Sequence, residues 1–145
     1  MRNENTGREQ PAVINELSAK VIGACIEVHR HLGPGLLEAV YEECLCEELT
    51  LQRISFERQV SIPVIYKGRE LQGSRYRLDL VVDRSIVVEL KSTEALLAVH
   101  KAQVLTQLKL TGLQLGLLIN FFVPRLTEGV KRIVNGPNLA ITRQS

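Results

Sequence analysis

Three charged residues interrupt two apolar runs between Tyr76 and Lys91. Asp79 lies in the first run, and Glu89 and Lys91 lie in the second, after the polar segment Asp83-Arg84-Ser85. Two apolar runs joined by a short polar segment predict a β-hairpin. If that segment is a three-residue loop, Asp79 lies across from Glu89, and Lys91 shares the face of Glu89 because alternate strand residues point the same way. A one-residue slip would place Asp79 on the other face.

Two carboxylates and an ammonium group on one face of a hairpin can bind a metal ion. Burying such charges is costly unless they are paired or hold a cation, and adjacent carboxylates repel each other, which raises the pKa of one of them. Carboxylate oxygens suit Mg²⁺ or Mn²⁺ better than Zn²⁺, and the ammonium of Lys91 can hold a phosphate or stabilise developing charge. The alternatives are a buried salt bridge and a solvated hairpin face.

The elements that position these charges belong to a chain of 145 residues, of which 45% are hydrophobic. This size and composition predict one domain over residues 13–134, with a flexible tail at residues 1–12 and another at residues 135–145. No apolar run is long enough to span a bilayer, and the first ten residues resemble no signal peptide. We therefore expect a cytoplasmic protein without a membrane partner.

The charges are unevenly distributed along the chain, although the net charge is only +2. Residues 1–52 carry four Lys or Arg against nine Asp or Glu, residues 53–91 carry eight against five, and residues 92–145 carry six against two. The second and third portions can present a basic face to a polyanion. Ordinary solvated charge is the alternative, because no basic cluster is dense enough to identify nucleic acid by itself.

Apolar residues at spacings of three or four predict three long helices. The first covers residues 13–32 and is ended by Gly33-Pro34-Gly35. The second runs from about residue 36 to residue 51, and the third covers residues 97–111 before Gly112. We expect the three cysteines to be reduced thiols packed on helices, because an odd number of cysteines without zinc-site spacing favours neither a disulfide framework nor a zinc site.

Strands are predicted between the second and third helices. A short candidate at residues 54–57 precedes an alternating stretch at residues 60–66, within which Pro63 indicates an edge position or a local irregularity. Lys67-Gly68 is a turn signal that leads to the central hairpin.

Two further elements are predicted after the third helix. The nearly continuous apolar run at residues 113–122 is typical of a buried strand, paired in parallel after a helical crossover, and residues 127–134 are predicted to form a last helix. The predicted order is α-α-β-β-β-β-α-β-α, which gives a mixed α/β sheet with helices packed on it.

Four other residues are candidates for the site, and three of them, Glu38, Arg77 and Gln103, have two interpretations each. Glu38 begins the second helix, where the helix dipole favours a carboxylate, and it can also point into the metal site. Tyr41, three residues later, can be its neighbour on the helix surface. Arg77 shares the face of Asp79 on a regular strand, where it can contact a phosphate or form an ion pair. Gln103 can hydrogen-bond a ligand or a metal-bound water, or simply be exposed.

Other polar residues are expected at the surface. His29 and His31 cannot share one helical face at a spacing of two, so we interpret them as end-of-helix or surface histidines and not as metal ligands. Glu42 and Glu43 belong to a run of acidic residues on the second helix that is expected to be solvated.

The motifs together resemble a known family. Gly35-Leu36-Leu37-Glu38-Ala39-Val40-Tyr41 fits the pattern that names the GxxExxY protein family. Asp79 followed by Glu89-Leu90-Lys91 resembles the PD-(D/E)XK motif of the restriction-endonuclease-like superfamily, and residues 103–122 are similar to it as well. The resemblance covers residues 13–134 and implies an α/β fold with a restriction-endonuclease-like mixed central sheet (αβββαβ core) flanked by helices.

The resemblance also implies a catalytic set. Asp79 and Glu89 would be ligands of Mg²⁺, with Mn²⁺ as an alternative, and Glu38 would be a further ligand or would hold a metal-bound water. Lys91 would orient the attacking water or stabilise the pentavalent phosphate. Gln103 matches the glutamine of the helix that follows the core hairpin in many such nucleases.

Substrate contacts are less well defined by the resemblance. Arg77 and Tyr41 are assigned to substrate binding. Similar sequences often carry tyrosine at position 107, where this chain has Gln107, and Leu78 takes the place of the proline before Asp79. Neither departure removes a carboxylate of the predicted metal site.

The implied function is hydrolysis of phosphodiester bonds in nucleic acid, with DNA as the expected substrate. A homodimer would allow such a small domain to cut both strands. The alternative is a catalytically silent module of the same fold that binds nucleic acid or a protein partner, because fold and function can separate.

Overall fold

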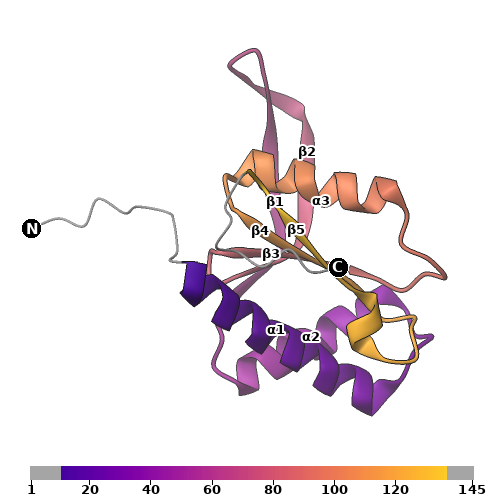
Figure 1. Cartoon of the computed structure of the whole chain (residues 1–145). Helices are drawn as coiled ribbons and strands as arrows, with labels where there is room; N and C mark the ends of the chain where they lie inside the picture. Colours follow the sequence, from indigo (N-terminus) through magenta and orange to yellow (C-terminus); the bar gives the residue numbers. More distant parts are fainter. Residues whose placement is uncertain (1–10, 137–145) are drawn as a thin grey trace, which may run out of the picture.

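The computed structural model describes residues 11–136 (Figure 1). Its elements, in chain order, are α1 (Pro11–Leu32), α2 (Glu38–Leu51), β1 (Phe56–Tyr66), β2 (Arg69–Val82), β3 (Ile86–Lys91), α3 (Ala98–Thr111), β4 (Leu115–Asn120), the 3₁₀ turn η1 (Leu126–Gly129) and β5 (Val130–Val134). The predicted tails lie mostly outside the described residues, although α1 already begins at Pro11, where the fixed φ of proline suits a first helical turn.

The five strands form one mixed sheet in the order β1-β2-β3-β4-β5. β3 and β4 run parallel, with Lys91 beside Asn120, and every other neighbouring pair is antiparallel. The predicted parallel pairing after the α3 crossover is therefore confirmed, and both central strands are almost wholly buried. The mixed sheet flanked by helices is consistent with the restriction-endonuclease-like fold that the motifs implied.

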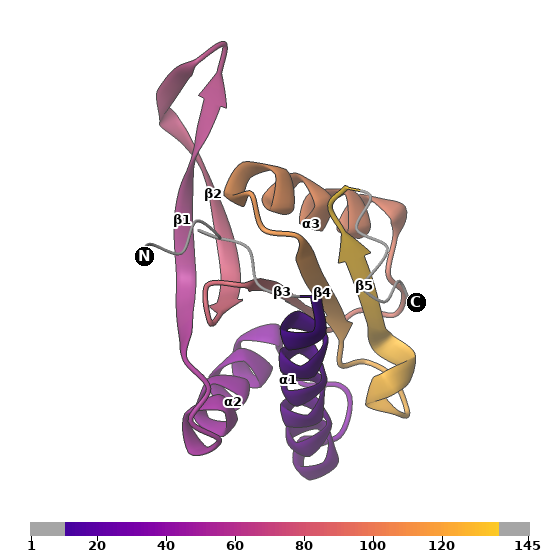
Figure 2. The same ribbon diagram turned by 60° about the vertical axis from the view of Figure 1, so that its left-hand side comes forward.

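Helices cover both faces of the sheet (Figures 1 and 2). α1 and α2 pack on one face over a core that includes Leu80, Val88 and Leu117. α3 packs on the other face over a smaller cluster that includes Val87 and Leu118. The site residues on β3 therefore lie between two helical layers, and their side chains point to one layer or the other by the alternation of the strand.

The β2–β3 hairpin has the predicted register. Val82 faces Ile86, so Asp83-Arg84-Ser85 is a three-residue loop, and Leu80 faces Val88. The ladder ends at this pair, and Asp79 and Glu89 are the next residues on the two strands. Asp83 and Arg84 both have positive φ, 49° and 53°, which lets the tight loop close.

β1 is one strand where the sequence suggested two, and β2 begins at Arg69, well before the predicted hairpin. Both strands continue beyond the end of β3 as a two-stranded ribbon that projects past α3 (Figure 2). β1 is an edge strand, and the register shifts between Pro63 and Ile65. Both expectations for Pro63, an edge position and a local irregularity, are therefore confirmed.

The last predicted helix, at residues 127–134, is wrong. The chain forms only the turn η1 there and then the edge strand β5, in which Val134 faces Leu115 of β4. A short apolar run does not distinguish helix from strand. Hydrogen bonding to the otherwise unpaired edge of β4 favours the strand here. Gly129 is required at the junction, because a Cβ there would lie 2.1 Å from the carbonyl oxygen of Asn120.

Two residues expected at the surface are buried. His29 is 8% exposed, and its Nε2 donates a hydrogen bond to the carbonyl oxygen of Val123, 2.9 Å away. Glu42 is 7% exposed and binds Arg58 at 2.7 Å and Gln59 at 2.6 Å, so it joins α2 to the base of β1. The sequence could not show either partner because both lie far along the chain.

The three cysteines are free thiols on α1 and α2, as predicted. Burial raises the pKa of the Cys25 and Cys46 thiols, which suits packing roles. Within residues 11–136, no helix is both long and apolar enough to cross a membrane.

Candidate active site

Asp79 lies where β2 separates from β3. The backbone pairing between these strands ends at Leu80 and Val88, and beyond it the carboxylate of Asp79 takes the place of a backbone acceptor. Its Oδ2 accepts a hydrogen bond from the backbone N–H of Leu90 at 2.9 Å. This contact fixes the Asp79 carboxylate against β3, at the residue that follows Glu89.

Glu89 is 8% exposed and points to the α3 side of the sheet, where Gln107 Nε2 donates to its Oε2 at 3.1 Å. Burial and the neighbouring Asp79 carboxyl raise the pKa of Glu89 from 4.5 to about 8, although Gln107 and Lys91 act in the opposite direction. Two carboxyl groups therefore lie so close that one of them is held protonated near neutral pH when no cation is bound.

Gln107, considered from the sequence only as a departure at a substrate-contact position, is a site residue whose contact with Glu89 was not predicted. It is 3% exposed and contacts Glu89, whereas Gln103, one turn earlier on α3, is exposed. A usable signal existed, because Gln107 lies between Val104 and Leu108 on the buried stripe of α3, and a polar residue on such a stripe needs a polar partner.

Lys91 ends β3 and is half-buried. Its parallel neighbour Asn120 uses its side chain to accept from the backbone N–H groups of Thr93 and Phe122, both at 3.1 Å, and to donate to the Thr93 carbonyl at 2.9 Å. Asn120 therefore ties together the two segments that leave the central strands, and this positions the chain that follows Lys91.

With this geometry established, comparison with known proteins assigns the chain to a family. The profile of the PD-(D/E)XK nuclease superfamily matches residues 15–133. The chain belongs to the PD-(D/E)XK nuclease superfamily. Comparisons with curated proteins and with solved structures gave no match.

Membership of the PD-(D/E)XK superfamily suggests a nuclease-type function and nucleic-acid binding, and nucleases of this superfamily generally use divalent metal ions. The match does not separate the GxxExxY proteins from other members, so that narrower resemblance stays a prediction.

The structure does not bring Glu38 into a shared cluster with Asp79 and Glu89. Glu38 is exposed at the start of α2, and within residues 11–136 no three His, Cys, Asp or Glu side chains converge on a common metal position. The preceding loop does lie near the end of β3, because Ser92 Oγ donates to the Leu36 carbonyl at 2.6 Å. Glu38 is therefore near this end of the sheet but outside the carboxylate pair.

Tyr41 is buried where the sequence analysis placed a substrate contact. It is 0% exposed and stacks on Phe121 with ring centroids 4.2 Å apart. Its hydroxyl donates to the Gly33 carbonyl and accepts from the Leu36 backbone N–H at 3.1 Å. Both hydroxyl functions are used inside the fold, so Tyr41 holds the loop before α2 and does not reach a substrate.

Arg77 is exposed on β2, across from Ser61 of β1. On a regular strand Leu78 and Leu80 would pack on the same face, but Leu78 packs under α3 and Leu80 packs under α1 and α2. Arg77 therefore does not lie on the same face as Asp79. The strand alternation is interrupted at Asp79, and Arg77 belongs to the projecting ribbon.

The donor set fits a hard divalent cation. Asp79 and Glu89 offer carboxylate oxygens, and the Oε1 atom of Gln107 is buried without a hydrogen-bond partner among the described residues. A buried amide oxygen normally has a donor, and a metal-bound water would supply one. Mg²⁺ is commonly held by one or two carboxylates together with waters and substrate phosphates, so two carboxylates are sufficient.

Proposed function

We propose that this protein hydrolyses phosphodiester bonds of DNA with the help of Mg²⁺, for which Mn²⁺ can substitute, bound by Asp79 and Glu89. The observation that carries this proposal is the buried pair of adjacent carboxyl groups: burial, together with the neighbouring Asp79 carboxyl, raises the pKa of Glu89 to about 8. Such a pair is unfavourable in the empty protein and becomes favourable when a cation neutralises it. This is the arrangement expected of a metal-binding site and not of a salt bridge.

The bound metal ion would activate a water molecule and neutralise charge on the phosphate. Asp79 is fixed for this role by the Leu90 N–H, and Glu89 by the amide of Gln107. Lys91 follows Glu89 by two residues on the same strand, so its ammonium is available to stabilise the developing charge of the phosphate. Its backbone is held by the Phe121 N–H, which donates to the Lys91 carbonyl at 2.9 Å.

The experiment compares cleavage of DNA and RNA, single and double stranded, by wild-type protein with Mg²⁺, with Mn²⁺ and with chelator. We expect metal-dependent cleavage of DNA that is lost in Asp79→Ala and in Lys91→Ala. Glu43→Gln is the matched control, because it also removes a carboxylate but lies exposed on α2. Circular dichroism and thermal unfolding would show that each variant is folded.

Cleavage that persists in both variants would assign the activity to another site or to a contaminant. If folded protein cuts no substrate with either metal yet binds nucleic acid in a salt-dependent manner, the nuclease proposal fails. The chain would then be a silent binding module of the nuclease fold.

A further inference from the structure

The projecting part of β1 and β2 is a feature that the carboxylate site does not use. Beyond Asp79 the two strands pair only with each other, from Val60 opposite Leu78 to Tyr66 opposite Arg69. β3 does not extend alongside them. The base of the ribbon packs on the α3 cluster through Val60, Ile62 and Leu78, and its outer part projects past α3 in both views (Figures 1 and 2). A ribbon this long, exposed on most of its length, does not contribute much to the core.

The tip of the ribbon is a tight turn formed by Lys67 and Gly68. Both residues have positive φ, 48° and 78°, as in the two-residue turn that matches the twist of a hairpin. Tyr66 is 60% exposed, and the Lys67 ammonium lies 5.5 Å from the centre of its ring. The turn therefore exposes an aromatic ring and a cation to solvent at the tip of the ribbon.

The ribbon is basic and its cations lack acidic partners. Residues 61–78 contain Lys67, Arg69, Arg75 and Arg77 against Glu70 alone, and all four cations are exposed. The ion pairs found among the described residues involve none of the four. Arg75 hydrogen-bonds only to Ser61, at 2.6 Å and 3.2 Å, so its charge is not neutralised.

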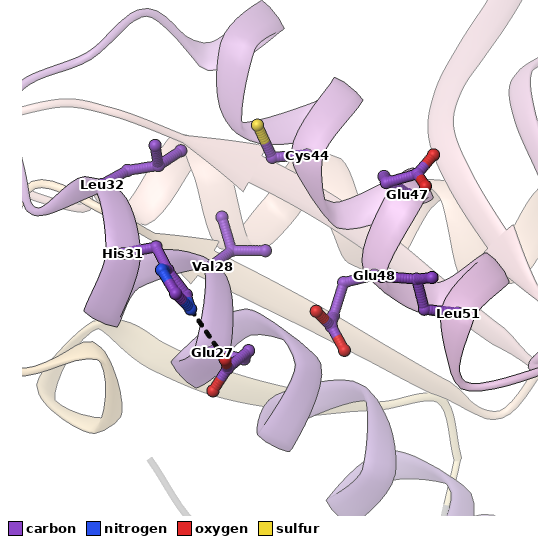
Figure 3. Close-up of a pocket in the computed structure, with 8 residues that line it drawn as sticks. All are labelled: Glu27, Val28, His31, Leu32, Cys44, Glu47, Glu48 and Leu51. Carbon is purple, nitrogen blue, oxygen red and sulfur yellow. Dashed lines mark hydrogen bonds and ion pairs between the residues drawn. The ribbon is translucent and has the colours of Figure 1, made fainter.

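The opposite layer of the molecule has the reverse charge. A hollow of about 170 Å³ between α1 and α2 is lined by Glu27, Glu47 and Glu48 (Figure 3). Glu27 pairs with Arg30 and His31, but α2 carries five glutamates and no basic residue. α3, on the ribbon side, carries Lys101 and Lys109 and no acidic residue. A polyanion is therefore attracted to the side of the ribbon and α3 and repelled from the side of α1 and α2.

We propose that the ribbon enters the major groove of double-stranded DNA while an adjacent backbone phosphate lies at Asp79. The major groove of B-form DNA is about 12 Å wide and admits a two-stranded β-ribbon, whereas the corresponding groove of duplex RNA is too narrow. Single strands are bound mainly by stacking on aromatic platforms, and the ribbon has one largely exposed aromatic ring, Tyr66 at its tip, and a half-buried one, Tyr76. Only the location of the scissile phosphate rests on the proposed nuclease function.

The reach of the ribbon fits this arrangement. Residues 59–66 of β1, at about 3.3 Å per residue, span roughly 23 Å from the level of Asp79 to the tip. This is shorter than one helical turn of DNA, about 34 Å, so the ribbon can stay within one groove. Lys67 and Arg69 at the tip then contact the phosphates that border the groove, and Arg75 and Arg77 contact those nearer the site.

The test measures binding in chelator, where no cleavage occurs, of a blunt DNA duplex, its single strand and the matching RNA duplex. The variant Lys67→Gln/Arg69→Gln removes two cations and keeps Gly68 and the turn. We expect the slope of log K against log salt for the DNA duplex to fall by about 1.8, at roughly 0.9 per lost phosphate contact. The matched control is Lys20→Gln/Arg30→Gln on α1, which removes the same charge and should leave the slope unchanged.

A second duplex, in which glucosylated 5-hydroxymethylcytosine fills the major groove, should bind at least tenfold more weakly than the unmodified duplex. The inference is overturned if the ribbon and control variants have the same slope, if single strands bind as well as duplex, or if the filled groove has no effect. Ribbon-dependent duplex binding by a protein that cuts nothing would uphold this inference while the nuclease proposal fails. Metal-dependent cleavage with no effect of the ribbon variant on binding would overturn this inference and leave the nuclease proposal standing.

Discussion

At the scale of single residues, Glu89 and Gln107 determine the properties of the site. Burial and the Asp79 carboxyl raise the pKa of Glu89 together, and the Gln107 amide only partly compensates. The site is therefore strained electrostatically when it is empty, and the amide oxygen of Gln107 has no partner among the described residues. Both features lead to measurable consequences.

The first prediction concerns Glu89→Gln and pH. The folded protein keeps a proton on Glu89 that the unfolded chain releases above its pKa of about 4.5. The stability contribution of this proton is fully present below pH 4.5 and is lost as pH rises through about 8. In metal-free protein, Glu89→Gln should therefore match the wild-type Tm near pH 4.5 and exceed it at pH 8, as measured by thermal unfolding with chelator.

The control for this prediction is Glu43→Gln, because Glu43 is exposed and its replacement should not change the pH dependence of Tm. An equal difference in Tm between Glu89→Gln and wild type at both pH values would contradict the raised pKa of Glu89.

The second prediction separates two glutamines on α3. Gln107→Leu removes the amide that orients Glu89 while keeping the side-chain volume, so metal affinity should fall roughly 10- to 100-fold. Gln103→Leu, on the exposed surface one turn away, should leave metal affinity unchanged. Calorimetric titration with Mn²⁺ measures both, and equal affinities in the two variants would remove Gln107 from the site.

At the scale of elements, close contacts between strands and helices hold the site in place. Asn120 joins the segments that follow β3 and β4, and Gly129 lets η1 approach the backbone of Asn120. On the face of the sheet that α3 covers, a Cβ at Gly116 would lie 2.5 Å from Val104 Cγ1, so α3 packs directly on β4 there. The distance between α3 and the sheet is what places Gln107 beside Glu89.

The third prediction tests the contact at Gly129. In Gly129→Ala the new methyl group would overlap a backbone carbonyl, which cannot rotate away as a side chain can. We expect a loss on the order of 1–3 kcal/mol in the free energy of unfolding, measured by urea denaturation. Gly23→Ala is the control, since a Cβ there meets nothing within 4 Å and alanine favours the α1 helix by about 0.5–1 kcal/mol. Wild-type stability in Gly129→Ala would show that η1 can move.

At the scale of the whole molecule, metal binding should be coupled to folding, because the carboxylate pair exists only when β2, β3 and α3 are assembled. A ligand that binds only the folded state stabilises it by about 2.7 kcal/mol at one hundred times its dissociation constant. The ligand carboxylates must be deprotonated, so the coupling depends on the pKa of Glu89.

The fourth prediction follows from this coupling. Mg²⁺ should raise the Tm of wild-type protein more at pH 8 than at pH 5, because Glu89 is largely protonated at the lower pH. The shift should disappear in Glu89→Gln and persist in Glu43→Gln. A shift that is equal at both pH values, or that survives in Glu89→Gln, would place the metal elsewhere.

Local patterns were sufficient to predict much of the fold. Alternation and a three-residue loop predicted the β2–β3 register, and a continuous apolar run after a helix predicted that β4 pairs in parallel with β3. The same kind of pattern was wrong for residues 130–134, because five residues with three β-branched apolar side chains suit either element. The outcome there depended on the free edge of β4, which lies outside the segment.

The sequence by itself determined which chemistry-bearing residues share the hairpin, because the determinants are local: strand alternation relates Glu89 to Lys91, and the three-residue loop brings Asp79 beside Glu89. Only the tertiary structure decided which residues from other elements join them. Gln107 contacts Glu89 in place of Gln103 because the rotation of α3 is set by packing on the sheet. Spacing along a chain defines a face, but the neighbour that covers the face is chosen by packing between distant segments.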